Sequence, residues 1–154
     1  MNITEDNLWH VLDAIDENIF FKDTEGRYAL ATHVCSMLNS NGDPGFSIFG
    51  KTDMDIQVDK ELGRKFYEED MKIIRTGESL KYVQKMQFGP ETYYYEITKN
   101  PVLDDDGRVM GIIGVIKDMT ELIKLQKQLE YYNITDLMTH TFNRFYFESG
   151  KYLE

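Results

Sequence analysis

Apolar residues recur at two different intervals along this chain. Between residues 60 and 76 the interval is three to four positions, which is typical of an amphipathic helix, and Gly77 is placed to end it. The predicted apolar face of this helix consists of Leu62, Phe66, Met71 and Ile74. Residues 80–88, 92–103 and 108–117 show strand-like alternation or apolar runs instead, so they predict three strands joined by glycine-containing turns.

The first half of the chain is divided into shorter elements. Leu8, Val11, Leu12 and Ile15 have helical spacing, which predicts an amphipathic helix over residues 7–15. Residues 18–23 and 27–31 predict a hairpin, and a helix over residues 33–38 and a helical segment from residue 50 follow. Strands come first, helices next and strands again, an order that indicates an α+β fold with an antiparallel sheet.

After residue 120 the apolar interval returns to three and four positions. A helix from Glu121 onwards is predicted, with one apolar seam made of Leu122, Leu125, Leu129 and Tyr132. The seam is about two heptads long, whereas a coiled coil is identified by heptads sustained over a greater length. Two interpretations therefore stay open: a surface helix that packs on its own domain, and one strand of a dimeric coiled coil.

Length and charge limit the possible partners. The chain has 154 residues and a formal net charge of -10, so one domain is expected and binding to nucleic acid or to an anionic membrane surface is not. No segment has the run of about 20 apolar residues that a membrane span needs. The only cysteine, Cys35, has no disulfide partner within the chain, and residues 1–10 lack the pattern of a signal peptide. A cytoplasmic location is expected.

The sequence shows no catalytic set and no metal site. His10, His33 and His140 are far apart and lack the spacing of metal ligands. Residues 104–107 (DDDG) are acidic but lack the regular ligand spacing of a calcium loop, so they predict a solvated turn. Residues 93–95 (YYY) suit a half-buried strand, and direct contact with a ligand is the alternative interpretation.

Residues 8–120 resemble the PAS family of sensor domains. The segments that carry the resemblance are residues 20–28 (FFKDTEGRY), 50–53 (GKTD) and 76–78 (TGE), then Pro101, Gly107, Gly111, Gly114 and residues 118–120 (DMT). The resemblance implies a five-stranded antiparallel sheet with helices packed on one face around a pocket for a small ligand. It also implies that Asp118 and Thr120 form the motif that joins the last strand to an output helix.

Physical reasoning assigns these two residues a capping role. Thr120 is expected to cap the helix that begins at Glu121, and Asp118 to place negative charge near its N-terminus. For the pocket, periodic placement suggests Phe66, Met71, Tyr95, Ile97 and Ile116. The ligand itself is not identified. Haem and a photoactive flavin are not expected, because residues 60–76 contain no histidine and Cys35 lies outside the cysteine motif of flavin-binding PAS domains.

Residues 136–147 (DLMTHTFNRFYF) resemble the opening of a GGDEF-type diguanylate cyclase domain. The expected organisation is an N-terminal helix (1–16), a PAS sensor domain (17–120), a linker helix (121–134) and a truncated GGDEF-like start (135–154). The chain would then be a sensor without catalytic residues of its own, controlling an output domain that makes cyclic di-GMP. A homodimer is expected to form through residues 119–133 and the N-terminal helix.

Two other functions stay open. One is the sensor of a histidine kinase, although the residues after His140 do not match a phosphoacceptor sequence. The other is a dimerisation module that binds no ligand.

Overall fold

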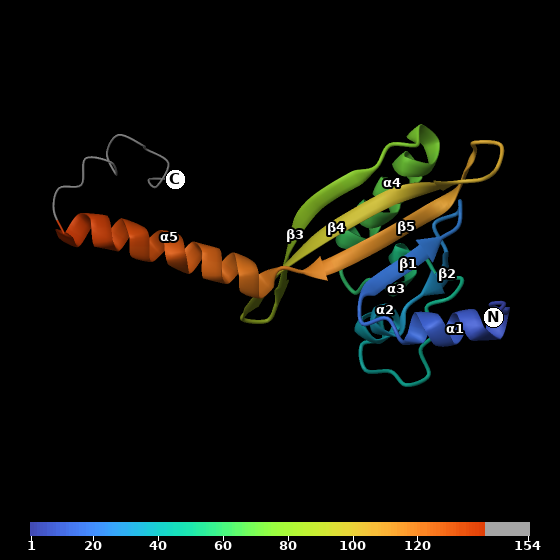
Figure 1. Cartoon of the computed structure of the whole chain (residues 1–154), viewed down its shortest axis with the longest axis horizontal. Coiled ribbons are helices and arrows are strands. Elements are labelled where there is room, and N and C mark those ends of the chain that lie inside the picture. Colours follow the sequence, from blue (N-terminus) through green and yellow to red (C-terminus); the bar gives the residue numbers. More distant parts are fainter. Residues whose placement is uncertain (141–154) are drawn as a thin grey trace. The chain divides into compact units, whose positions relative to one another are not determined.

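The computed structural model describes residues 1–140 and has an α+β fold (Figure 1). Its elements, in chain order, are α1 (Glu5–Asp13), β1 (Asn18–Lys22), β2 (Tyr28–Ala31), α2 (His33–Asn39), α3 (Asp53–Ile56), α4 (Lys60–Thr76), β3 (Leu80–Phe88), β4 (Glu91–Leu103), β5 (Val109–Asp118) and α5 (Thr120–His140). The strands form one five-stranded antiparallel sheet in the order β2-β1-β5-β4-β3. The predicted fold class is confirmed.

The chain divides into two compact units. Within the described chain, the first contains residues 1–84 and 96–117, and the second contains residues 85–95 and 118–140. The second unit therefore combines the end of the β3–β4 hairpin with α5. Among the described residues, no helix is both long enough and apolar enough to cross a membrane.

Local side-chain contacts set several element boundaries. Helix α1 begins two residues earlier than predicted because the hydroxyl of Thr4 accepts a hydrogen bond from the amide of Asn7 at 3.3 Å. Helix α4 has the predicted bounds: Asp59 caps its first turn, and Gly77 ends it in the left-handed region at φ 72°. The buried face of α4 differs from the prediction. It consists of Gly63, Phe66, Asp70 and Ile73.

Two turns of the sheet have the same construction. In the β1–β2 turn, one carboxylate oxygen of Asp23 accepts hydrogen bonds from the amides two and four residues later, and Asp104 does the same in the β4–β5 turn. Gly26 and Gly107, three residues after each aspartate, have φ of 77° and 79°. The predicted solvated turn at residues 104–107 is therefore observed, with one Asp104 oxygen engaged by the backbone.

Two aromatic rings of β1 lie over glycines of β5. Phe20 pairs directly with Gly114, and a Cβ atom at Gly114 would lie 2.1 Å from the Phe20 ring. A Cβ atom at Gly111 would lie 2.4 Å from the ring of Phe21. These glycines let the rings lie flat across the neighbouring strand, and Phe20 joins a core made of Phe20, Tyr28, Ala31, Cys35, Ile48 and Ile56.

Substituting alanine for Gly114 tests this packing. We expect Gly114→Ala to lower the free energy of unfolding by about 1–3 kcal/mol, because the Phe20 ring is itself buried and has to move. Gly45→Ala is the matched control, since its nearest neighbour, an Asp43 oxygen at 3.5 Å, is at an ordinary contact distance. Urea denaturation measures both. Equal stability of the two variants would contradict the packing role of Gly114.

Candidate functional site

A fully buried lysine lies on the inner face of the sheet in the first unit. Lys22 follows Phe20 at the two-residue interval of β1, so both side chains point toward the helices. Its ammonium nitrogen lies 2.5 Å from an oxygen of Asp53 at the start of α3 and 2.7 Å from an oxygen of Asp70 in α4. One cation thus connects a strand to two helices.

The ion pairs continue as a connected series. Asp70 accepts a second hydrogen bond from Lys99 of β4 at 2.8 Å, and Lys99 lies 3.5 Å from Glu69. We call Asp53, Lys22, Asp70, Lys99 and Glu69 the buried ion chain. Neutral groups complete it at both ends: the hydroxyl of Tyr28 donates to Asp53, and that of Tyr82 donates to Glu69, each at 2.8 Å.

Aromatic rings surround the two ammonium groups. The nitrogen of Lys22 lies 4.7 Å from the centre of the Phe20 ring and 4.6 Å from that of Tyr28. The nitrogen of Lys99 lies 5.3 Å from the centre of Phe66. The negative faces of these rings partly replace the water that the cations have lost.

Their partners keep Lys22 and Asp53 charged at neutral pH. Burial alone would lower the pKa of Lys22, but Asp53 and Asp70 outweigh burial and raise it above its ordinary value. Burial would likewise raise the pKa of Asp53, but Lys22 outweighs it and holds that pKa below its usual range. Burial, with the nearby Asp53 charge, raises the pKa of Tyr28 well above its ordinary value, so Tyr28 stays a hydrogen-bond donor.

The predicted pocket residues fall in different places. Phe66 and Ile97 are buried on the inner side of the first unit, and Ile116 is partly buried against the core. Met71 approaches the β1–β2 turn, with its terminal methyl 3.1 Å from where a Cβ atom of Gly26 would lie. Tyr95 belongs to the second unit, where it stacks on Tyr93 with ring centres 6.2 Å apart. Their role as a ligand pocket stays a prediction.

Sequence reasoning missed the charged residues of the core. A signal for them was present, because each occupies a position where the local period predicts an apolar residue. Lys22 shares its strand face with Phe20, Lys99 shares its face with Ile97, and Asp70 lies on the helix face of Phe66. Charged residues at core-facing positions indicate mutual pairing.

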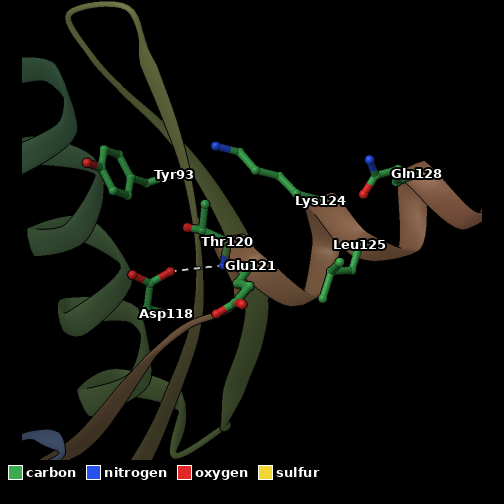
Figure 2. A pocket seen from close by; sticks show the side chains of 7 residues that line it. All are labelled: Tyr93, Asp118, Thr120, Glu121, Lys124, Leu125 and Gln128. Carbon is green, nitrogen blue, oxygen red and sulfur yellow. Dashed lines mark hydrogen bonds between the residues drawn. The ribbon is translucent and has the colours of Figure 1, made fainter.

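In the second unit, the sheet is joined to α5 by direct hydrogen bonds around the predicted relay residues, and Figure 2 shows the one between Asp118 and Thr120. The backbone amide of Tyr94 donates to the hydroxyl of Thr120 at 2.9 Å, and the amide of Met119 donates to the carbonyl of Tyr94 at 2.8 Å. A carboxylate oxygen of Asp118 accepts from the amide of Thr120 at 2.9 Å. The Asp118 carboxylate therefore lies at the start of α5, as the capping prediction expected, whereas the hydroxyl of Thr120 accepts from the neighbouring strand.

An open cleft of about 590 Å³ lies beside this junction. Its lining is mixed in chemistry and consists of Tyr93, Asp118, Thr120, Glu121, Lys124, Leu125 and Gln128 (Figure 2). Both predicted relay residues therefore border the cleft. Within residues 1–140, no group of three or more His, Cys, Asp or Glu side chains is arranged to hold a metal ion.

Removing the central cation tests the buried ion chain. We expect Lys22→Met to lower the free energy of unfolding by about 3–5 kcal/mol, because it leaves two buried carboxylates with too few partners. Lys81→Met is the control, since that side chain is 67% exposed and lies 3.9 Å from Glu96, so its loss costs about 0–1 kcal/mol. Urea denaturation compares them. If Lys22→Met and Lys81→Met lower the free energy of unfolding by similarly small amounts, Lys22 does not hold the core together.

The lowered pKa of Asp53 predicts sensitivity to acid. Its contribution is fully present above the unfolded-state pKa of about 4 and is lost as the pH falls through the lower folded-state pKa. We expect the free energy of unfolding to decline below about pH 4, and Asp53→Asn to reduce that decline. Asp105→Asn, in the exposed β4–β5 turn, is the control. Denaturation at several pH values measures the slope, and an unchanged slope in Asp53→Asn would contradict the assignment.

Comparison with known proteins places this geometry in a family. A sequence model described as the PAS fold matches residues 12–124, and no cyclase domain is detected in this chain. A diguanylate cyclase of Vibrio cholerae serotype O1 is 28% identical over 138 residues. That alignment covers 87% of this chain and 42% of the relative, so the chain spans less than half of the relative's length. The stretch that resembles a GGDEF opening lies partly in the last turn of α5 and otherwise outside the described residues.

Solved structures show the same fold. The PAS domain of Bordetella pertussis BvgS matches with a TM-score of 0.63 at 22% identity, covering 84% of this chain and 96% of that one. Vibrio cholerae VqmA matches with a TM-score of 0.62 at 20% identity, covering 79% and 53%. The PAS resemblance of the sequence is thereby confirmed. The five-stranded sheet, the helices on its inner face and the family match together establish that this chain belongs to the PAS fold family of sensory domains.

Proposed function

We propose that this chain is a sensory module that reports its state through α5 to a diguanylate cyclase output domain. The relative named diguanylate cyclase supports this output. The alignment covers 87% of this chain but 42% of the relative, so the relative has room for a separate output domain outside the aligned region. GTP, the substrate of such an output domain, is a cytoplasmic metabolite. We therefore place the module in the cytoplasm.

The observation that carries the proposal is the junction of sheet and helix. Strand β5 ends at Asp118 and α5 begins at Thr120, so a single residue separates them. Tyr94 of β4 is hydrogen-bonded to residues on both sides of the helix start. A shift of either strand would change the hydrogen bonds that fix the first turn of α5, and the helix would carry that change to the next domain.

Dimerisation is part of the proposal. The apolar seam of α5 is exposed over the described chain: Leu122 by 48%, Leu125 by 50%, Leu129 by 62% and Tyr132 by 57%. Helix α1 also exposes apolar side chains, Leu8 by 38% and Val11 by 50%. Pairing of these surfaces in a homodimer would remove them from water and bring two output domains together, each holding one GTP.

The input is proposed to be a small molecule held in the first unit near Phe66 and Ile97. Native mass spectrometry of the gently purified chain tests for it. A stoichiometric adduct, or a rise in unfolding temperature with one compound of a metabolite library, is the expected result. If the chain carries no adduct and no compound of the library changes its unfolding temperature, the alternative of a dimerisation module that binds no ligand is favoured.

A chimaera tests the relay. This chain replaces the matching 138-residue region of the Vibrio cholerae cyclase, and cyclic di-GMP formed from GTP is measured by chromatography. We expect an active chimaera in which Thr120→Val lowers the output about fivefold, because the variant loses one hydrogen bond worth about 1 kcal/mol and loosens the helix start. Thr92→Val, in the same hairpin, is the control. An output insensitive to Thr120 would contradict the relay.

A further inference from the structure

We infer that Tyr94 and Lys127 hold α5 in one rotational phase, so that its leucine face points away from the hairpin and stays available to a second copy of this chain. This inference deepens the proposed function and rests on it for the identity of the partner. Tyr94 and Lys127 are positioning residues in this view. All contacts that support it lie within the second unit.

The first attachment point is the backbone of Tyr94. Its amide donates to the hydroxyl of Thr120, and its carbonyl accepts from the amide of Met119. The carbonyl of Met119 in turn accepts the hydrogen bond from the amide of Ile123 at 2.9 Å. The hairpin therefore fixes where α5 begins, although one point of attachment leaves the helix free to swing and turn.

The second attachment point is the side chain of Tyr94. Lys127 donates a hydrogen bond from its ammonium group to the Tyr94 hydroxyl at 2.9 Å, and that nitrogen lies 4.7 Å from the ring centre. The hydrogen bond from Lys127 lowers the pKa of Tyr94, as expected for an oxygen that accepts from a cation. One tyrosine thus contacts α5 at its start and again further along.

Helical geometry shows what two attachment points achieve. At about 3.6 residues per turn, Thr120 and Lys127 are two turns apart and differ by only about 20° around the axis. They therefore lie on the same face of α5. The seam residues point elsewhere, at about 120° to 200° from Thr120 by the same count. These residues are Leu122, Leu125, Leu129 and Tyr132.

The clamp and the apolar seam thus occupy opposite faces of α5. Figure 2 shows the same separation one turn into the helix, where Lys124 and Leu125 leave it on different sides. The exposure of the seam, between 48% and 62%, follows from a helix held by its other face. Of the seam residues, Leu125 also lines the cleft. A turn of α5 about its axis would bring the other seam residues toward the cleft and present charged residues to the partner.

A second copy fits the seam better than another kind of partner. The seam repeats at the three and four residue spacing with which two identical helices interlock, and each helix covers the apolar side chains of the other. The clamp is outside the interface in such a pair. Both chains can therefore keep their clamps while they are paired.

Distance measurements between spin labels test the clamp directly. Labels are placed on cysteines that replace Glu91 at the tip of the hairpin and Glu130 of α5, both exposed in the full chain. Cys35 does not compete, because it is buried and burial raises the pKa of its thiol to about 12. Labelled chain is diluted with unlabelled chain so that only distances within one chain are recorded.

Two substitutions release the second attachment point, and one serves as control. Tyr94→Phe removes the accepting hydroxyl and Lys127→Met removes the donor, so each is expected to broaden the distance distribution about twofold. The double variant should broaden it no further, because the two groups act as a pair. Lys124→Met removes a charge one turn earlier without removing a hydrogen bond to Tyr94, and it should leave the distribution narrow. Distributions that match the parent in Tyr94→Phe and Lys127→Met, or equal broadening in Lys124→Met, would overturn the clamp.

The same variants in the chimaera separate this inference from the proposed function. Broader distributions together with a fall in cyclic di-GMP output of about fivefold support both, with unfolding temperature unchanged as evidence that the fold is intact. Broader distributions with unchanged output keep the clamp and show that the relay does not depend on it, and the relay is then decided by Thr120→Val. Unchanged distributions refute the clamp, whatever the output does.

Discussion

The pairing of Lys22 with Asp53 and Asp70 is the interaction on which the first unit depends. An ammonium group without access to water is tolerated only when opposite charges contact it directly, so the positions of both carboxylates are constrained by it. Through this requirement β1, α3 and α4 are held at fixed spacing. Apolar packing alone would allow them to slide, because it has no preferred direction.

The buried ion chain also explains why the inner face of this sheet is not simply an apolar cavity. The region where PAS domains are expected to hold a ligand contains Lys22 and Lys99, each with a carboxylate partner and an aromatic ring beside it. A ligand that enters there must either fit beside intact ion pairs or supply polar groups that replace one partner. Charge complementarity therefore limits the class of ligand that could bind there.

Sequence periodicity recovered the elements well because each one has a strong local signal. Helix α4 and strand β3 were predicted with their observed bounds, since a cap and a left-handed glycine define the helix ends and alternation defines the strand. The buried face of α4 was predicted incorrectly because Asp70 occupies a core position. A prediction that uses only apolar residues assigns a charged residue to the exposed face. The partner of Thr120 could not be predicted either, because Tyr94 is distant in sequence and the hydrogen bond exists only after the strands pair.

The same distinction between local and long-range information applies to α5. The spacing of its leucines depends only on neighbouring residues, so the sequence reveals that an apolar seam exists. The direction of the seam depends on the contacts that hold the opposite face of α5. Here Tyr94 of β4 makes those contacts, with Thr120 and Lys127. Because these contacts fix a helix by hydrogen bonds rather than by apolar burial, they can be broken and re-formed at small cost. A junction built in this way can hold the helix in one state and release it to another, whereas a helix buried along its length would stay in place.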